Sequence, residues 1–260
     1  MSSSSVPRSA GSVWPFLALV YGTTWLFQLP WLAASHHVLP GPPARYEGLV
    51  VLGFFGPTLL AVAVALSEGG RAGLRDLLRP FRFLGASFRL YLLALAFSPL
   101  LFLIARCAWG LASENAGPWF YPPRSAAHVA AMAIIPFTEQ LPWRALVYPR
   151  LAARYGEAGG SVATGLAWGL FHAQKHAFFP DTTLPATVAM VCLMTASAVV
   201  FTALQRRARG SVLVVVAAHA GVYLDNPAYA LPDVRPLVAL TVIYVLVAAA
   251  LLVALRRLRA

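Results

Sequence analysis

The chain has 260 residues, of which 59% are hydrophobic and only 11% are charged, and its formal net charge is +11. Soluble domains carry about 25% charged residues, so this composition excludes an ordinary soluble fold, and the apolar excess also excludes a disordered chain. The basic excess does not indicate a nucleic-acid partner, because the charges lie between long apolar runs. We therefore predict an all-α integral membrane helix bundle.

Eight apolar segments follow one another along the chain. They cover residues 13–34, 49–66, 88–111, 126–148, 161–179, 184–204, 211–224 and 236–255. Most approach the ~20 residues that cross ~30 Å of hydrocarbon, although the seventh is short. We predict about eight transmembrane helices. The first is expected to be retained, because its apolar stretch exceeds the ~15 residues of a signal peptide.

The remaining residues complete the predicted organisation. A serine-rich tail, 1–12, is expected to be disordered, and 236–260 hold the last membrane helix and a basic end. Within the N-terminal part, 13–111, residues 70–84 carry one stripe of arginines and another of leucine and phenylalanine. This pattern predicts an amphipathic helix on the inner membrane surface, attracted to anionic lipid, with an ordinary basic connector as the alternative.

The basic residues predict the orientation. With the N-terminus inside, fourteen of the 20 basic residues lie on the inner side and four on the outer side. The positive-inside rule then predicts that both termini are cytoplasmic. The frequent alanine and arginine indicate a GC-rich bacterial genome, and hence a bacterial inner membrane.

Three ionisable residues lie inside predicted spans: Glu139, His172 and His219. Such residues are costly in a bilayer and by default functional. At 1.5 Å per helical residue their depths from the inner face are ~16, ~18 and ~12 Å. Because three different helices bring them to similar depths, we predict one shared buried site.

Helical spacing adds neighbours to this site. Residues four apart share a helix face, which pairs Glu139 with Trp143, His172 with Trp168, and His219 with Tyr223. Gln140 and Arg144 are also four apart and are expected to pair on an adjacent face, with Arg144 reaching toward the inner surface. His128 and His176 lie near span ends and are expected at the membrane interface.

At these residues the chain resembles the CAAX prenyl protease 2 and lysostaphin-resistance-protein-A-like group of intramembrane proteases, the CPBP or Abi family. That family carries E-E-x-x-x-R, F-x-x-x-H and H-x-x-x-N or H-x-x-x-D on successive membrane helices. The chain has Glu139-Gln140-Leu-Pro-Trp-Arg144, Trp168-Gly-Leu-Phe-His172 and His219-Ala-Gly-Val-Tyr223, and the resemblance covers residues 125–226. Gln140, Trp168 and Tyr223 depart from the family pattern, and Asn226 is a candidate substitute for the missing Asn or Asp.

The resemblance implies peptide-bond hydrolysis within the membrane, on an apolar or membrane-bound peptide. Glu139 is expected to act as general base on a water that His172 helps to hold, and His219 and Tyr223 to stabilise the oxyanion. Trp143 and Trp168 are expected to shield the site and contact the substrate. Gln140 and Arg144 are expected to be structural.

Several alternatives remain at this point. A zinc site is one alternative, with Glu139, His172 and His219 as a plausible ligand set, and His176 adds an i, i+4 pair with His172. The glutamate of an H-E-x-x-H motif is missing, so we prefer a site without a cofactor. A catalytically silent family member, acting as a membrane scaffold or partner, is the second function. A transporter or proton relay is the third, because buried Glu and His suit that work as well.

Overall fold

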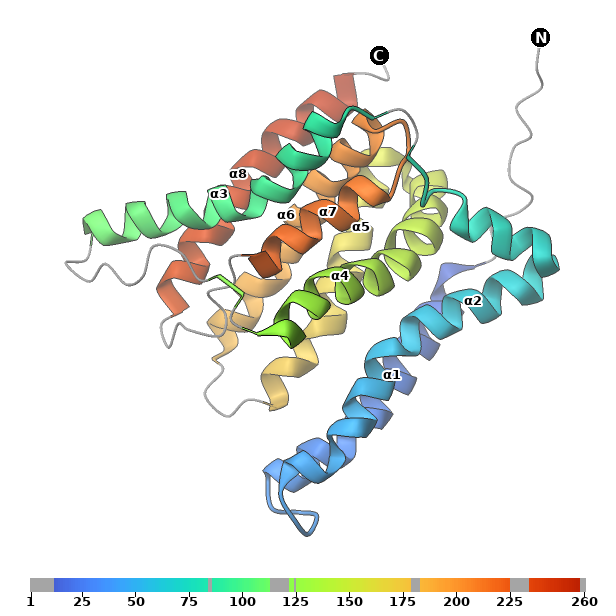
Figure 1. Cartoon of the computed structure of the whole chain (residues 1–260), viewed down its shortest axis with the longest axis vertical. Helices are drawn as coiled ribbons and strands as arrows, with labels where there is room; N and C mark the ends of the chain where they lie inside the picture. Colours follow the sequence, from blue (N-terminus) through green and yellow to red (C-terminus); the bar gives the residue numbers. More distant parts are fainter. Residues whose placement is uncertain are drawn as a thin grey trace.

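The computed structural model describes residues 12–83, 86–112, 122–123, 125–178, 183–224 and 234–257, and the regular elements among them are all helical (Figure 1). In chain order they are α1 (Val13–Ser35), the 3-10 helix η1 (Pro43–Tyr46), α2 (Glu47–Leu78), α3 (Phe88–Ala112), α4 (Ala126–Gln140), the π-helix η2 (Leu141–Val147), α5 (Tyr148–Phe178), α6 (Leu184–Arg207), α7 (Leu213–Leu224) and α8 (Val234–Arg257). The predicted all-α class is confirmed. The predicted tail lies outside the described residues except for Ser12.

Four helices in the described part of the chain are long and apolar enough to cross a membrane. They span Val13–Ser35, Pro43–Leu78, Phe88–Ala108 and Leu184–Arg207, and two shorter apolar helices cover Leu213–Leu224 and Leu237–Val253. Large side chains such as Leu26, Leu59 and Leu93 are exposed on the outside of the bundle, as expected where lipid replaces water. The chain is an integral membrane protein, whereas the count of eight spans and their orientation stay predictions.

The predicted amphipathic segment, 70–84, is shorter as a helix than expected. Helix α2 is broken at Gly70, whose φ of 57° and ψ of −141° lie outside the helical region, and it ends at Leu78. Pro80 explains this end, because its nitrogen carries no hydrogen and cannot continue the helical hydrogen bonds. The arginines of the segment are exposed, while Leu74, Leu77 and Phe81 pack toward the core. Most of its apolar stripe therefore contacts the bundle itself, whereas Leu78 is 41% exposed.

The fourth and fifth predicted segments, 126–148 and 161–179, are joined more closely than expected. Helices α4 and η2 and the first turns of α5 follow without interruption, and the break comes only at Gly156, with φ of 74° and ψ of 169°. This left-handed backbone favours glycine. The chain reverses there, so that the backbone of Gly160 lies against that of Ala152. The rest of α5 then runs back through the bundle.

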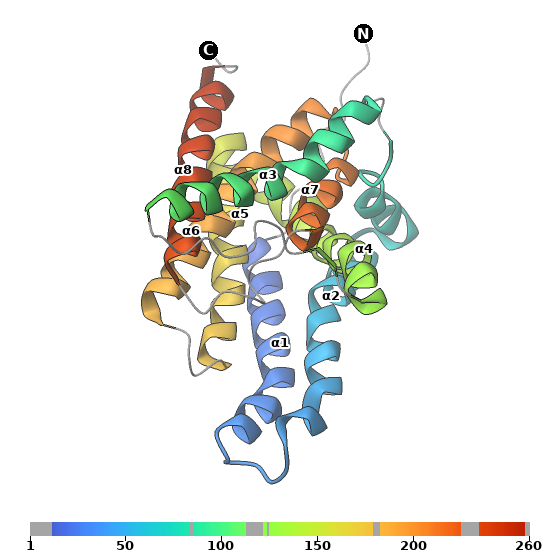
Figure 2. The same ribbon diagram turned by 60° about the vertical axis from the view of Figure 1, so that its left-hand side comes forward.

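Helix α5 packs along α6, α6 along α8, and α3 along α7, while Figure 2 shows α1 and α2 as a hairpin that extends beyond the other helices. The approach of α5 to α6 depends on two glycines four residues apart. A Cβ atom on Gly165 would lie 2.6 Å from the Cα of Thr195, and one on Gly169 would lie 3.0 Å from the Cα of Val191. Small residues at this spacing let membrane helices approach closely.

This contact predicts the effect of a larger residue. Gly165→Leu should lower the free energy of unfolding by about 1–3 kcal/mol, because the side chain would overlap the backbone of α6. Gly22→Leu is the matched control, since nothing lies within 4 Å of a Cβ atom there. Thermal unfolding of both variants in detergent measures the difference. Equal melting temperatures would contradict the importance of this contact.

Candidate active site

Glu139 and His172 lie together in the interior of the bundle. Glu139 is the second-to-last residue of α4 and is 7% exposed. His172, on α5, is 2% exposed. The Nε2 atom of His172 lies 3.7 Å from Oε1 of Glu139. This distance is longer than a direct hydrogen bond and short enough for one water to contact both atoms. The predicted proximity of these two residues is confirmed.

Trp168 orients both of these side chains. Its indole Nε1–H donates to Oε2 of Glu139 at 2.9 Å, and its backbone carbonyl lies 2.8 Å from Nδ1 of His172. A carbonyl can only accept, so Nδ1 of His172 carries the hydrogen, and Nε2 of the neutral ring is an acceptor. Trp168, expected to shield the site, therefore also supplies a hydrogen bond that the family's Phe cannot make.

His219, on α7, is held by Gln140. The Nε2 amide of Gln140 lies 2.9 Å from Nδ1 of His219, and the two side chains are buried. The amide nitrogen is a donor, so Nδ1 accepts and the neutral His219 ring carries its hydrogen on Nε2. The edge of His219 also contacts Trp168, with ring centroids 5.4 Å apart. The three predicted polar residues therefore meet around Trp168.

The expected pair of Gln140 and Arg144 is wrong. Arg144 is 1% exposed, so it does not reach the surface, and its NH2 group donates to the carbonyl of Ala198 at 3.0 Å and to Oγ1 of Thr202 at 3.1 Å, both on α6. Its guanidinium also lies 4.8 Å from the ring centroid of Tyr148. Arg144 thus ties η2 to α6, and Gln140 is free to bond His219.

The π-helix η2 is the physical reason for this difference. In η2 the backbone N–H of Tyr148 bonds to the carbonyl of Trp143, five residues earlier, so side chains four apart no longer share a face. Trp143, which was expected on the same face as Glu139, is buried at 1% exposure. It packs on Phe171, the neighbour of His172, with ring centroids 5.5 Å apart. Such π segments are frequent at functional sites.

Tyr223 lies at the edge of the site. Its ring is half-buried and its centroid lies 5.7 Å from that of His219, as the i, i+4 spacing predicted. His128, which was expected at the interface, binds the backbone carbonyl of Tyr223 through Nε2 at 2.8 Å and so joins the start of α4 to the end of α7. No sequence pattern indicated this contact. Asn226 lies outside the described residues.

Each member of the alternative zinc set, Glu139, His172 and His219, is hydrogen-bonded to another protein group in the structure. Within the described ranges, no three His, Cys, Asp or Glu side chains lie together so that they could hold a metal ion. Trp168 and Gln140 also occupy Oε2 of Glu139 and Nδ1 of His219. The side chain of His176 lies outside the described residues.

Residues 122–224, less than half of the chain, match the family model of the type II CAAX prenyl endopeptidase Rce1-like proteins. No curated protein matches the chain. The match includes all three motifs and the residues that surround Glu139. Residues 122–224 are thus similar to the Rce1-like family of type II CAAX prenyl endopeptidases, and the resemblance carried by the three motifs is confirmed over this part of the chain.

Proposed function

We propose that the protein is an intramembrane endopeptidase that hydrolyses a peptide bond of an apolar or membrane-associated substrate. The family match supports a protease at the family level. The observation that supports the proposed mechanism is a pair of hydrogen-bond acceptors in a buried site. These acceptors are Oε1 of Glu139 and Nε2 of His172, which lie 3.7 Å apart. Two adjacent acceptors suit one water molecule, which has two hydrogens to donate.

In the proposed reaction this water donates one hydrogen to Glu139 and the other to His172. Its oxygen lone pair is then directed away from both residues and attacks the carbonyl carbon of the scissile bond. Glu139 accepts a proton as the carbon–oxygen bond forms. When the tetrahedral intermediate collapses, the carbon–nitrogen bond breaks and Glu139 returns the proton to the leaving amine. The products are a new carboxyl end and a new amino end.

His219 is the opposite tautomer to His172, so we propose that its Nε2 donates a hydrogen bond where that of His172 accepts one. Because Gln140 donates to Nδ1, the hydrogen on Nε2 of His219 is a donor for the oxyanion of the intermediate. The hydroxyl of Tyr223 is the proposed second donor. Gln140 acts through His219, so we assign it as a positioning residue.

The proposed setting is a bacterial inner membrane with both termini in the cytoplasm, in contact with anionic lipid on the inner leaflet. We propose that the protein binds no nucleic acid and needs no metal for the reaction. The arginine distribution supports the orientation, and two exposed ion pairs agree with it. Arg150 binds Glu68 and Arg206 binds Glu157, which joins segments that the sequence assigns to the inner side.

The first test removes the proposed base. Glu139→Gln should lower proteolysis about 10²–10⁴-fold, because an amide cannot take a proton from water. The measurement is a search for new protein termini in membranes of cells that carry the native chain or the variant at matched abundance. Glu47→Gln, an exposed acid at the start of α2, is the control and should leave these termini unchanged.

Two other outcomes would overturn this proposal. If no termini depend on Glu139 while the native protein is abundant, the chain is a silent scaffold. If Glu139 instead controls ion or solute flux in liposomes and no peptide bond breaks, it is a transporter or proton relay.

A second variant tests the tautomer argument. Gln140→Leu keeps the volume and burial but removes the donor to His219, so kcat should fall up to about 10²–10³-fold, the value of one oxyanion donor, with KM little changed. Gln28→Leu, a buried amide on α1, is the matched control. A rise in KM alone, or a loss of folded protein, would assign Gln140 a binding or structural role instead.

A third test concerns zinc. Proteolysis by the purified chain should persist in a strong chelator, because Glu139 and His172 supply the proposed base and water contacts without a metal. The measurement is the cleavage rate before and after chelation, with zinc added back. A loss that zinc restores would replace this mechanism with a zinc-dependent one.

A further inference from the structure

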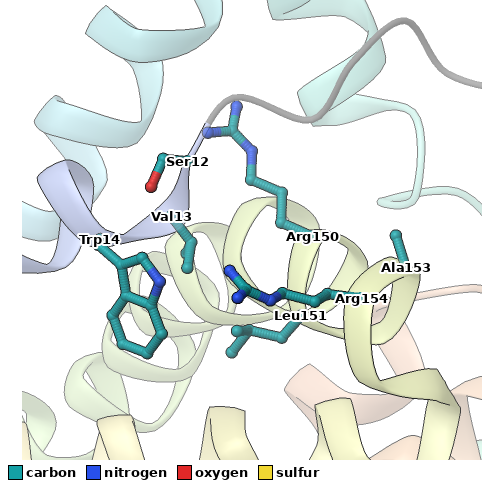
Figure 3. Close-up of a pocket in the computed structure, with 7 residues that line it drawn as sticks. All are labelled: Ser12, Val13, Trp14, Arg150, Leu151, Ala153 and Arg154. Atoms are coloured by element: carbon teal, nitrogen blue, oxygen red, sulfur yellow. The ribbon is translucent and has the colours of Figure 1, made fainter.

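A pocket of about 440 Å³ lies away from the candidate active site, where the start of α1 meets the first turns of α5. Ser12, Val13 and Trp14 line one side, and Arg150, Leu151 and Arg154 line the other (Figure 3). These α5 residues precede the break at Gly156, and His172 is on the part of α5 beyond it. The pocket is therefore a separate site that the proposed reaction does not use.

The lining combines positive charge with an apolar base. Figure 3 shows the guanidinium groups of Arg150 and Arg154 turned toward the start of α1. Val13 and Leu151 are buried beside them, at 6% and 2% exposure. Glu68 pairs with Arg150 and leaves Arg154 as the second positive group of the lining. Two guanidinium groups lining a half-open pocket suit a phosphate, which arginine binds through paired hydrogen bonds.

The position of the pocket indicates where such a phosphate comes from. Its α1 residues are the first residues of a helix that is long and apolar enough to cross a membrane, so the pocket lies where a span meets the lipid headgroups. Trp14 is 54% exposed at this point, and exposed tryptophans are typical of the membrane interface. Basic pockets between membrane helices bind anionic headgroups.

We propose that this pocket binds the phosphate of one anionic phospholipid, with Arg154 and Arg150 contacting the phosphate and Trp14 lying against the glycerol and the first acyl carbons. The bound lipid joins α1 to α5 at the membrane surface. This site is distinct from the expected attraction of the 70–84 segment to the bilayer, because it holds a single headgroup between two helices.

Native mass spectrometry of the purified full chain in detergent measures this directly. Dioleoyl phosphatidylglycerol should bind as a single adduct, and more tightly than dioleoyl phosphatidylcholine. Arg154→Gln should lower the affinity for phosphatidylglycerol about five- to tenfold. Arg154→Lys keeps the charge and should recover part of the loss. Arg207→Gln is the matched control, because Arg207 is exposed on α6 and does not line the pocket.

A second variant is expected to strengthen lipid binding instead of weakening it. Glu68→Gln removes the carboxylate beside Arg150, so the pocket becomes more positive and the phosphatidylglycerol adduct should tighten. The proposal is wrong if Arg154→Gln and Arg207→Gln weaken binding equally, or if both lipids bind alike. Displacement by inorganic phosphate at the same concentration as the lipid would show a free-anion site instead.

Discussion

A carboxylate buried among membrane helices is stable only if other groups hydrogen-bond it, and this constraint organises the site. Glu139 receives one hydrogen bond from the indole of Trp168 and has His172 beside its other oxygen. Each partner comes from α5, so α4 and α5 must be held at a fixed distance. The helix that carries Trp168 and His172 is set in place by glycines that bring it against α6. The packing of the bundle thus determines the environment of one carboxylate.

Buried charge also explains the role of η2. Arg144 follows Glu139 by only five residues, yet its donors reach the carbonyl of Ala198 and the hydroxyl of Thr202 on α6. The wider turns of the π-helix separate Arg144 from Gln140, which then bonds His219. The two consecutive residues Glu139 and Gln140 therefore serve two different histidines. A regular α-helix at this point would not produce this division.

Two histidines of similar burial have different chemistry because their Nδ1 atoms have different partners. A backbone carbonyl accepts from His172, and a side-chain amide donates to His219. Two of the three departures of this chain from the family pattern fall on these partners: Trp168 binds Glu139, and Gln140 binds His219. Each of these two residues therefore hydrogen-bonds a buried polar side chain of the candidate site.

Composition and the order of the apolar segments determined the all-α membrane fold, and α1, α3, α6 and α7 begin and end close to their predicted limits. The sequence also determined which polar residues meet, because ionisable residues are tolerated in a bilayer only at a site that satisfies them. It did not determine their contacts. Trp168 and Glu139 are 29 residues apart and Gln140 and His219 are 79 apart, so helical periodicity carries no information about either bond. Only the tertiary structure decided the partner of Arg144, the position of the π-helix and the tautomer of each histidine, because these depend on how neighbouring helices pack.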